Sequence, residues 1–246
     1  MSNPFHQSES LDRPIDVAQL SAEQILARVL HRDGLMLVID KPAGLPVHRG
    51  PKGGPNLEAS FDALRFGLPR PPVLAHRLDK DTSGCLVLGR HRKATASLGL
   101  LFKHGKISKT YWAVVEGGPA EDQGTIDMPL GRLNAERGWW QKVDPEGQPA
   151  VTNWKVMGRG DGLAWLALEP VTGRTHQLRV HTSAQGWPIV GDNIYGNGPR
   201  FGEPRLHLHS REIGIPISKN KEPVRVVAPA PDHMRERLRI CGWNGE

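Results

Sequence analysis

Glycine and proline interrupt the apolar residues of this chain at short intervals, and this punctuation limits the folds that it can adopt. The 246 residues include 28 glycines and 21 prolines. Between about residues 107 and 170 they separate short apolar runs such as Trp165-Leu-Ala-Leu168, which is typical of strands joined by turns. Helical segments occur among the strands without a regular alternation. The pattern predicts an α+β fold with a largely antiparallel mixed β-sheet and flanking helices.

Several strands and helices can be placed along the chain. The apolar run 35–39 ends at Asp40-Lys-Pro-Ala-Gly44, and the run 110–115 is β-branched and aromatic, so both predict strands. Apolar residues at helical spacing predict helices over about 57–67, 91–104 and 175–186. In the last of these, Thr175 is placed to cap the helix, and Arg174, Leu178 and His181 would share one face.

The length is compatible with one main folded domain. Residues 1–25 are mostly polar and contain Pro4 and Pro14, which predicts an N-terminal arm rather than a separate folded domain. The folded domain is expected over 26–246. The N-terminus lacks the pattern of a signal peptide, and no apolar run is long enough to span a bilayer. We therefore expect a cytoplasmic protein that does not enter the membrane.

Charge and cysteine content restrict the partners and cofactors. Lys and Arg total 32 against 26 Asp and Glu, a formal net charge of +6, which favours a polyanionic partner such as nucleic acid. Cys85 and Cys241 are far apart, so neither a disulfide framework nor a thiolate zinc site is indicated. His207 and His209 lack a third ligand at suggestive spacing. We expect no metal and, because phosphate-binding glycine loops are lacking, no nucleotide cofactor.

Two charged segments are the candidates for chemistry. Ala75-His-Arg-Leu-Asp-Lys-Asp-Thr-Ser-Gly84 places a carboxylate among basic residues beside an apolar run; taken alone, it fits a salt-bridged turn as well as a functional loop. The second segment, 173–196, carries Arg174 and other basic residues near a predicted helix start. An arginine there gains nothing from the helix dipole, so Arg174 is expected to face a carboxylate or a phosphate.

These segments resemble a known family. His-Arg-Leu-Asp-x-x-Thr-Ser-Gly at 76–84, Lys-x-Tyr-x-Ala-x-Val at 109–115, and Gly-Arg-Thr-His-Gln-Leu-Arg-Val-His with Gly-x-Pro-Ile-x-Gly-Asp-x-x-Tyr-Gly at 173–196 are similar to motifs of the RluA-type RNA pseudouridine synthases. The resemblance covers about residues 30 to 230, in the family's order. It implies the pseudouridine synthase fold and the isomerisation of specific uridines in structured RNA, either ribosomal or transfer RNA.

The resemblance also implies roles for three catalytic residues. Asp79 would be the essential carboxylate, as a nucleophile at C1′ or a base at C2′. Arg174 would pair with Asp79 and keep it ionised. Tyr111 would stack on the uracil, and its hydroxyl would assist removal of the C5 proton. We expect a monomer that needs no cofactor.

The target nucleotide must leave its stack to reach Asp79. His76 and Arg77 are the candidates for filling the vacated position, and Leu178 for lining the uracil pocket. Lys109 and Arg179 are expected to contact phosphates. Two alternatives compete with the synthase: a metal-dependent nuclease that uses Asp79, Asp81 and Asp192, and a catalytically silent RNA-binding module.

Overall fold

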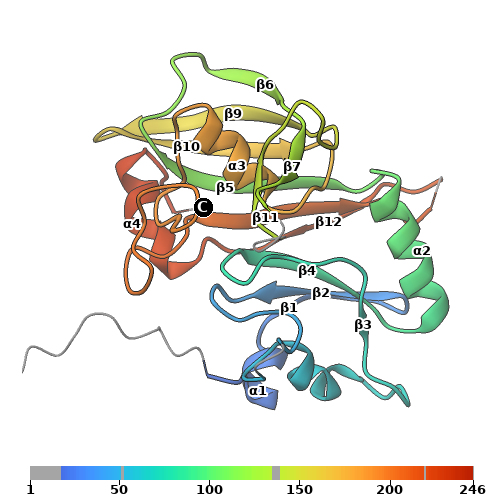
Figure 1. Ribbon diagram of the computed structural model, residues 1–246. Helices are drawn as coiled ribbons and strands as arrows, with labels where there is room; N and C mark the ends of the chain where they lie inside the picture. The colour runs from blue at the N-terminus through green and yellow to red at the C-terminus, as the bar shows by residue number, and fades with distance from the viewer. Residues whose placement is uncertain (1–17, 51–52, 135–138, 219, 246) are drawn as a thin grey trace, which may run out of the picture.

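Short strands make up most of the chain, as the spacing of glycine and proline predicts. The computed structural model describes residues 18–50, 53–134, 139–218 and 220–245. A ten-stranded sheet has the order β1-β2-β4-β11-β5-β10-β9-β6, with β3 beside β4 and β12 beside β11 (Figure 1). Its strands are β1 (Val29–Arg32), β2 (Met36–Lys41), β3 (Val73–Leu74), β4 (Ser83–Gly89), β5 (Ser108–Glu116), β6 (Gln123–Asp127), β9 (Val151–Gly160), β10 (Leu163–Pro170), β11 (Leu208–Ile215) and β12 (Val224–Val227).

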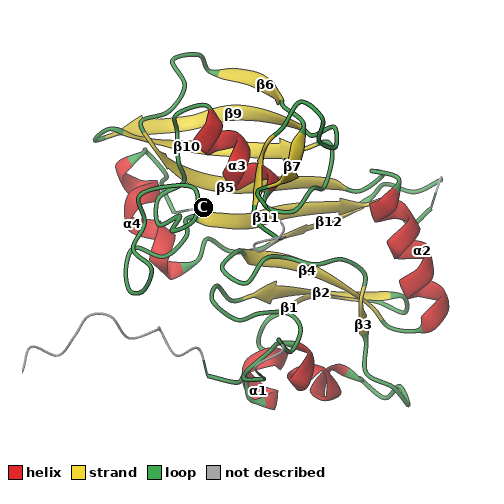
Figure 2. Ribbon diagram, viewed as in Figure 1, coloured by secondary structure: helices red, strands yellow, loops and turns green. Residues whose placement is uncertain are grey.

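One strand pair of this sheet is parallel. β4 and β11 run side by side in the same direction, with His209 opposite Ser83 and Ser210 opposite Gly84. The other pairs, such as β2 with β4 and β5 with β11, are antiparallel. A separate hairpin consists of β7 (Leu130–Arg132) and β8 (Gln141–Val143). The predicted α+β class with a largely antiparallel mixed sheet is therefore confirmed (Figure 2).

Helices cover both faces of the sheet. They are α1 (Ala22–Leu26), the 3-10 helix η1 (Glu58–Leu64), α2 (Arg92–Lys103), α3 (Gln177–Ala184) and α4 (Asp232–Ile240). Side chains of β2 and β4 alternate between a core that includes α1 and η1 and a core that includes α2. Side chains of β5 and β10 likewise alternate between a core that includes α3 and one that includes α4. None of the described helices is long and apolar enough to cross a bilayer.

Two of the three predicted helices differ in detail from the prediction. The segment 91–104 forms α2 as expected, with the His91 side chain accepting a hydrogen bond from the backbone N–H of Ala94 at 3.2 Å. Leu57, Phe61 and Leu64 are buried together as predicted, but the helix is of the 3-10 type. Thr175 does not cap α3, because the helix begins two residues later, after His176. Arg174 therefore precedes the helix.

The N-terminal end of the described chain packs on the domain. Gln19 donates hydrogen bonds to the backbone carbonyl of Asn56 and to the Ser60 hydroxyl, and Ser21 caps α1. Ile25 is fully buried in the core that includes η1. Residues 18–25 of the predicted arm are thus held against η1, whereas residues 1–17 lie outside the described part of the chain.

Candidate active site

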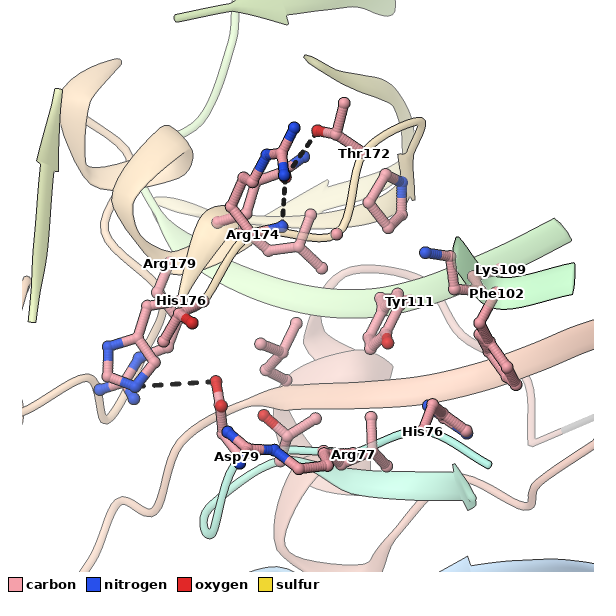
Figure 3. A pocket seen from close by; sticks show the side chains of 18 residues that line it. His76, Arg77, Asp79, Phe102, Lys109, Tyr111, Thr172, Arg174, His176 and Arg179 are labelled. Carbon is pink, nitrogen blue, oxygen red and sulfur yellow. Dashed lines mark hydrogen bonds and ion pairs between the residues drawn. The ribbon is translucent and has the colours of Figure 1, made fainter. Parts of the chain in front are cut away.

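Asp79 lies in the loop that joins β3 to β4. Leu78 is buried in the core beneath the loop, so the next side chain turns outward. The backbone N–H of Thr82 donates to the carbonyl of Asp79 at 3.2 Å and closes a turn. The Asp79 side chain is 35% exposed and faces a pocket (Figure 3). The loop therefore presents a carboxylate that solvent or a ligand can reach.

A buried lysine holds this loop from below. Nζ of Lys41, at the end of β2, donates to the backbone carbonyls of Pro42, Lys80 and Thr82 at 2.9, 2.8 and 2.8 Å. Three acceptors match the three N–H groups of an ammonium. Burial lowers the pKa of Lys41 to about 7, while the nearby Asp81 and Asp79 carboxylates act in the opposite direction. Sequence reasoning did not single out Lys41 as a support of this loop, because only the fold brings its strand beneath the loop.

The pocket in front of Asp79 has a volume of about 350 Å³. Apolar side chains from α3 and β11, Leu178 and Leu208, form part of its wall, together with the ring of Tyr111 from β5. Leu178, the candidate for lining a uracil pocket, is thus in the same pocket as Asp79 and Tyr111. A pocket with an apolar wall, an aromatic ring and one reachable carboxylate suits a flat, polar ring such as a nucleobase.

Tyr111 lies between two of the cores, those beneath η1 and beneath α3. Its side chain forms a hydrogen bond with the side chain of Ser210 on the neighbouring strand β11. Burial raises the pKa of Tyr111, and the Asp79 carboxylate adds to the effect. The phenol is therefore protonated at neutral pH, which suits stacking and hydrogen-bond donation rather than the abstraction of a proton.

The partner of Asp79 is a residue that was not predicted for this role. Nε2 of His176 lies 3.8 Å from Oδ2 of Asp79 (Figure 3). His176 has a left-handed backbone, with φ of 53°, a conformation that is uncommon for residues other than glycine. Its Nδ1 is 2.7 Å from the Tyr195 hydroxyl. Burial lowers the pKa of His176, and Asp79 acts against this shift.

Arg174 lines the pocket but does not meet the expectation of an ion pair with Asp79. Its side chain is exposed, and Nε donates to the backbone carbonyl of Pro149 at 3.0 Å. Its backbone N–H donates to Oε1 of Gln177 at 3.0 Å. Because helix α3 begins at Gln177, Arg174 is not on the helical face that sequence spacing suggested, and Figure 3 shows it on the far side of the pocket from Asp79.

Arg179 is a second arginine near the site, and its charge interacts with Asp79 although its ion pair is with Asp192. Its side chain is buried, and Nε and Nη2 bind the two Asp192 carboxylate oxygens at 2.8 and 2.7 Å. Burial alone would lower the pKa of Arg179, but the hydrogen bond with Asp192 and the negative charges of Asp79 and Asp81 outweigh burial and raise it. The prediction that Arg179 contacts phosphate is not supported, because its side chain is 3% exposed and its guanidinium is already paired.

Both carboxylate oxygens of Asp192 take part in this ion pair. Burial would raise its pKa, but the hydrogen bond and charge of Arg179 outweigh burial and lower it. The same carboxylate also accepts from the backbone N–H groups of Ile194 and Tyr195 at 2.9 and 3.0 Å. Its oxygens are thus occupied, which argues against the magnesium ligand that the nuclease alternative requires.

The remaining predicted residues lie around the pocket in different settings. His76 is part of its wall: the ring stacks on Phe102 with centroids 4.1 Å apart, and Nε2 accepts from the backbone N–H of Val87 at 3.0 Å. Burial lowers the pKa of His76 to about 3, so a neutral, packed ring is not free to enter an RNA stack. Arg77 is exposed at the rim. Lys109 lines the pocket, and burial lowers its pKa.

The described residues contain no group of three His, Cys, Asp or Glu side chains placed to hold a metal ion. What the site brings together is a reachable carboxylate, a neutral histidine, a protonated phenol and a buried arginine. Such an arrangement can place a carboxylate against a sugar carbon while an aromatic ring holds the base.

Comparison with known proteins identifies the family. The sequence model of the RNA pseudouridylate synthase family matches residues 35–184. An uncharacterised RNA pseudouridine synthase of Zymomonas mobilis is 43% identical over 206 residues, which cover 83% of this chain and 94% of that protein. The ribosomal large subunit pseudouridine synthase C of Vibrio cholerae is 32% identical over 219 residues, which cover 85% of this chain and 68% of that protein.

A solved structure agrees with the sequence matches. The human protein named RNA Pseudouridylate Synthase Domain Containing 4 superimposes with a TM-score of 0.74 at 29% identity, over 89% of this chain and 95% of that one. The family match includes Asp79, Tyr111 and the start of α3, so the resemblance seen in the sequence is confirmed. The chain belongs to the RNA pseudouridine synthase family and is an RNA-modifying isomerase.

Proposed function

We propose that this enzyme converts a specific uridine of a structured RNA to pseudouridine, with Asp79 as the reacting carboxylate. The observation that carries the proposal is the position of Asp79. Its partly exposed carboxylate opens onto a pocket that has the ring of Tyr111 and the side chain of Leu178 in its wall. A flipped uridine whose base entered this pocket would bring its sugar to the carboxylate.

The reaction conserves every atom of the nucleotide apart from exchange of one proton with solvent. The bond from C1′ to N1 breaks, the uracil turns, and C5 forms a bond to C1′; the proton of C5 leaves to solvent and N1 gains one. Asp79 acts either as a nucleophile at C1′ or as a base at C2′, and both routes start from the ionised carboxylate. Tyr111 supports the base by stacking, because its protonated phenol is a poor proton acceptor.

Three residues around Asp79 have positioning roles in this proposal. Arg179, held by Asp192, supplies a fixed positive charge near Asp79, and His176 contacts the carboxylate directly. Lys41 holds the backbone of the loop on the far side. Preorganised charges of this kind stabilise the transition state without rearranging during the reaction.

Ribosomal or transfer RNA is the proposed substrate. The Vibrio cholerae relative is named for the large ribosomal subunit, which favours ribosomal RNA as the first target to examine. Carbodiimide-based mapping of pseudouridine in total RNA, with and without the gene, would identify the position.

Release of tritium tests the reaction directly. RNA labelled with tritium at C5 of uridine, taken from cells that lack the gene, should lose tritium to water when the enzyme is added. Because no step of the proposal uses a metal ion, we expect the same rate in excess EDTA. A metal-dependent nuclease would instead lose its activity on chelation and would shorten the RNA.

A further inference from the structure

An exposed tryptophan lies next to the proposed active site. Trp139 precedes β8 and is 58% exposed, which is unusual for so large an apolar side chain. Four other tryptophans are at most 9% exposed, namely Trp112, Trp154, Trp165 and Trp243. The Trp139 ring meets that of His176 edge to face, with centroids 5.6 Å apart and planes at 88°, and His176 contacts Asp79.

The hairpin that carries Trp139 is tied to the site. The backbone N–H of Gln141 in β8 donates to the Tyr195 hydroxyl at 2.9 Å, and the same hydroxyl lies 2.7 Å from Nδ1 of His176. A short chain of contacts therefore runs from the start of β8 to Asp79. Trp139 is held beside the catalytic loop although much of its ring remains in contact with solvent.

Trp139 lines a groove of about 730 Å³ that continues from the uridine pocket. The groove and the pocket share Arg77, Asp79 and His176, so they meet at the carboxylate. Apart from Arg179, whose charge is paired with Asp192, the lining cations are Arg77, Lys80 and Arg200, and the lining anions are Asp79 and Asp81. A cationic groove that contains an exposed aromatic ring is suited to single-stranded nucleic acid.

We propose that Trp139 is a stacking platform for the nucleobase next to the target uridine. The inference rests on the proposed function: once the uridine occupies the pocket, its neighbour is one phosphodiester away and must lie near the rim at Asp79. The groove is the adjoining space. Arg77, Lys80 and Arg200 would face the phosphates, and the indole would hold the base in place of the stacking that is lost when the uridine flips out.

Kinetics of tritium release distinguish this role from a structural one. Trp139→Ala should raise KM about tenfold, in line with the loss of one stacked base, and leave kcat within about twofold. Trp139→Phe keeps a ring and should restore most of the affinity. Met157→Ala is the matched control, because Met157 is also exposed but lines a different hollow with β6; its KM should not change.

Direct binding gives a second readout that does not need turnover. In the Asp79→Asn background, addition of a nine-residue oligouridylate should quench tryptophan fluorescence, and Trp139→Phe should remove most of that quenching. An unchanged KM for Trp139→Ala in an active enzyme would overturn the stacking proposal alone. Absence of tritium release by the wild type would overturn the proposed function, and the fluorescence titration would then decide whether Trp139 binds RNA.

Discussion

The two arginines of the segment 173–179 differ in what they contact, although the sequence alone does not show this difference. Arg174 is exposed and donates to a backbone carbonyl, whereas Arg179 is buried in a bidentate pair with Asp192. A charge that is fixed and shielded from water acts more strongly on a neighbour than one that moves in solvent. Arg179 also interacts electrostatically with Asp79, so we expect its fixed charge to matter more at that carboxylate than the exposed charge of Arg174.

Substitution of the two arginines should separate their roles. Arg179→Lys keeps the charge but loses the bidentate geometry, and we expect kcat/KM to fall at least about tenfold, equivalent to about 1.4 kcal/mol. Arg174→Ala should change kcat/KM by less than about threefold, because its hydrogen bond is exposed. Tritium-release kinetics measure both. A larger effect for Arg174→Ala than for Arg179→Lys would restore the original assignment.

The sequence, through its resemblance to the family, could predict that Asp79, Tyr111 and Leu178 share one pocket, but not which residue lies next to Asp79. The carboxylate stands in a charged loop before an apolar run, and such loops are visible in a sequence. His176 becomes its neighbour only because its backbone takes the left-handed conformation. Lys41 binds the loop through backbone carbonyls. Every residue has a backbone carbonyl, so the sequence does not reveal these contacts.

At the scale of elements, a helix could be predicted well where its ends are set by neighbouring residues, and less well where they are set by contacts with a distant strand. Helix α2 has its cap, its apolar face and Gly105 within one segment, and its prediction is confirmed. The start of α3 is set by Gln177, whose side chain donates to the backbone carbonyl of Val151 and to the Thr152 hydroxyl on β9. Contacts with a distant strand override the capping preference of Thr175.

The parallel pair β4 and β11 depends on one glycine. Gly84 has φ of 104°, and a Cβ atom there would overlap the backbone of Ser210. Gly84→Ala should therefore lower the free energy of unfolding by about 2–3 kcal/mol and displace the loop that carries Asp79. Urea denaturation followed by circular dichroism measures the stability.

A second glycine provides the control for this substitution. Gly99 lies within α2, and a Cβ atom added to it would have no neighbouring atom within 4 Å. Gly99→Ala should raise the stability by about 0.5–1 kcal/mol, because alanine favours helices. Equal effects of the two substitutions would contradict the close packing of β4 on β11.

At the scale of the whole molecule, the sheet brings together segments that are far apart in the sequence. β11 lies between β4 and β5, and this places Ser210 beside both Gly84 and Tyr111. The strand order was not predictable, because alternating apolar residues specify which face of a strand is buried but not which strand lies next to it. The fold class was predictable from the spacing of glycine and proline.

Burial of histidines predicts sensitivity to acid. Burial lowers the pKa of His76 to about 3 and the pKa values of His207 and His209 to about 4, against about 6.5 in an unfolded chain. Between pH 6.5 and 4 the unfolded chain binds protons that the folded chain does not, so stability falls as the pH decreases. Asp40, whose pKa is raised to about 6 by burial, has the opposite effect on stability, because in this pH range the folded chain binds a proton there that the unfolded chain does not.

Denaturation at two pH values tests this expectation. Each buried histidine contributes on the order of 1.4 kcal/mol per pH unit within its window, so the free energy of unfolding should be several kcal/mol lower at pH 5 than at pH 7. His209→Gln should make the dependence on pH shallower. A free energy of unfolding that is unchanged between pH 7 and pH 5 would show that these histidines are not held neutral.

The central claim is that the Asp79 carboxylate performs the isomerisation, and Asp79→Asn tests it most directly. The variant preserves the size of the side chain and removes its charge and nucleophilicity. We predict that tritium release from 5-tritiated uridine RNA disappears, while the affinity for the same RNA, measured by filter binding, stays within about threefold of the wild type. Tritium release by Asp79→Asn at a rate near that of the wild type would contradict the account.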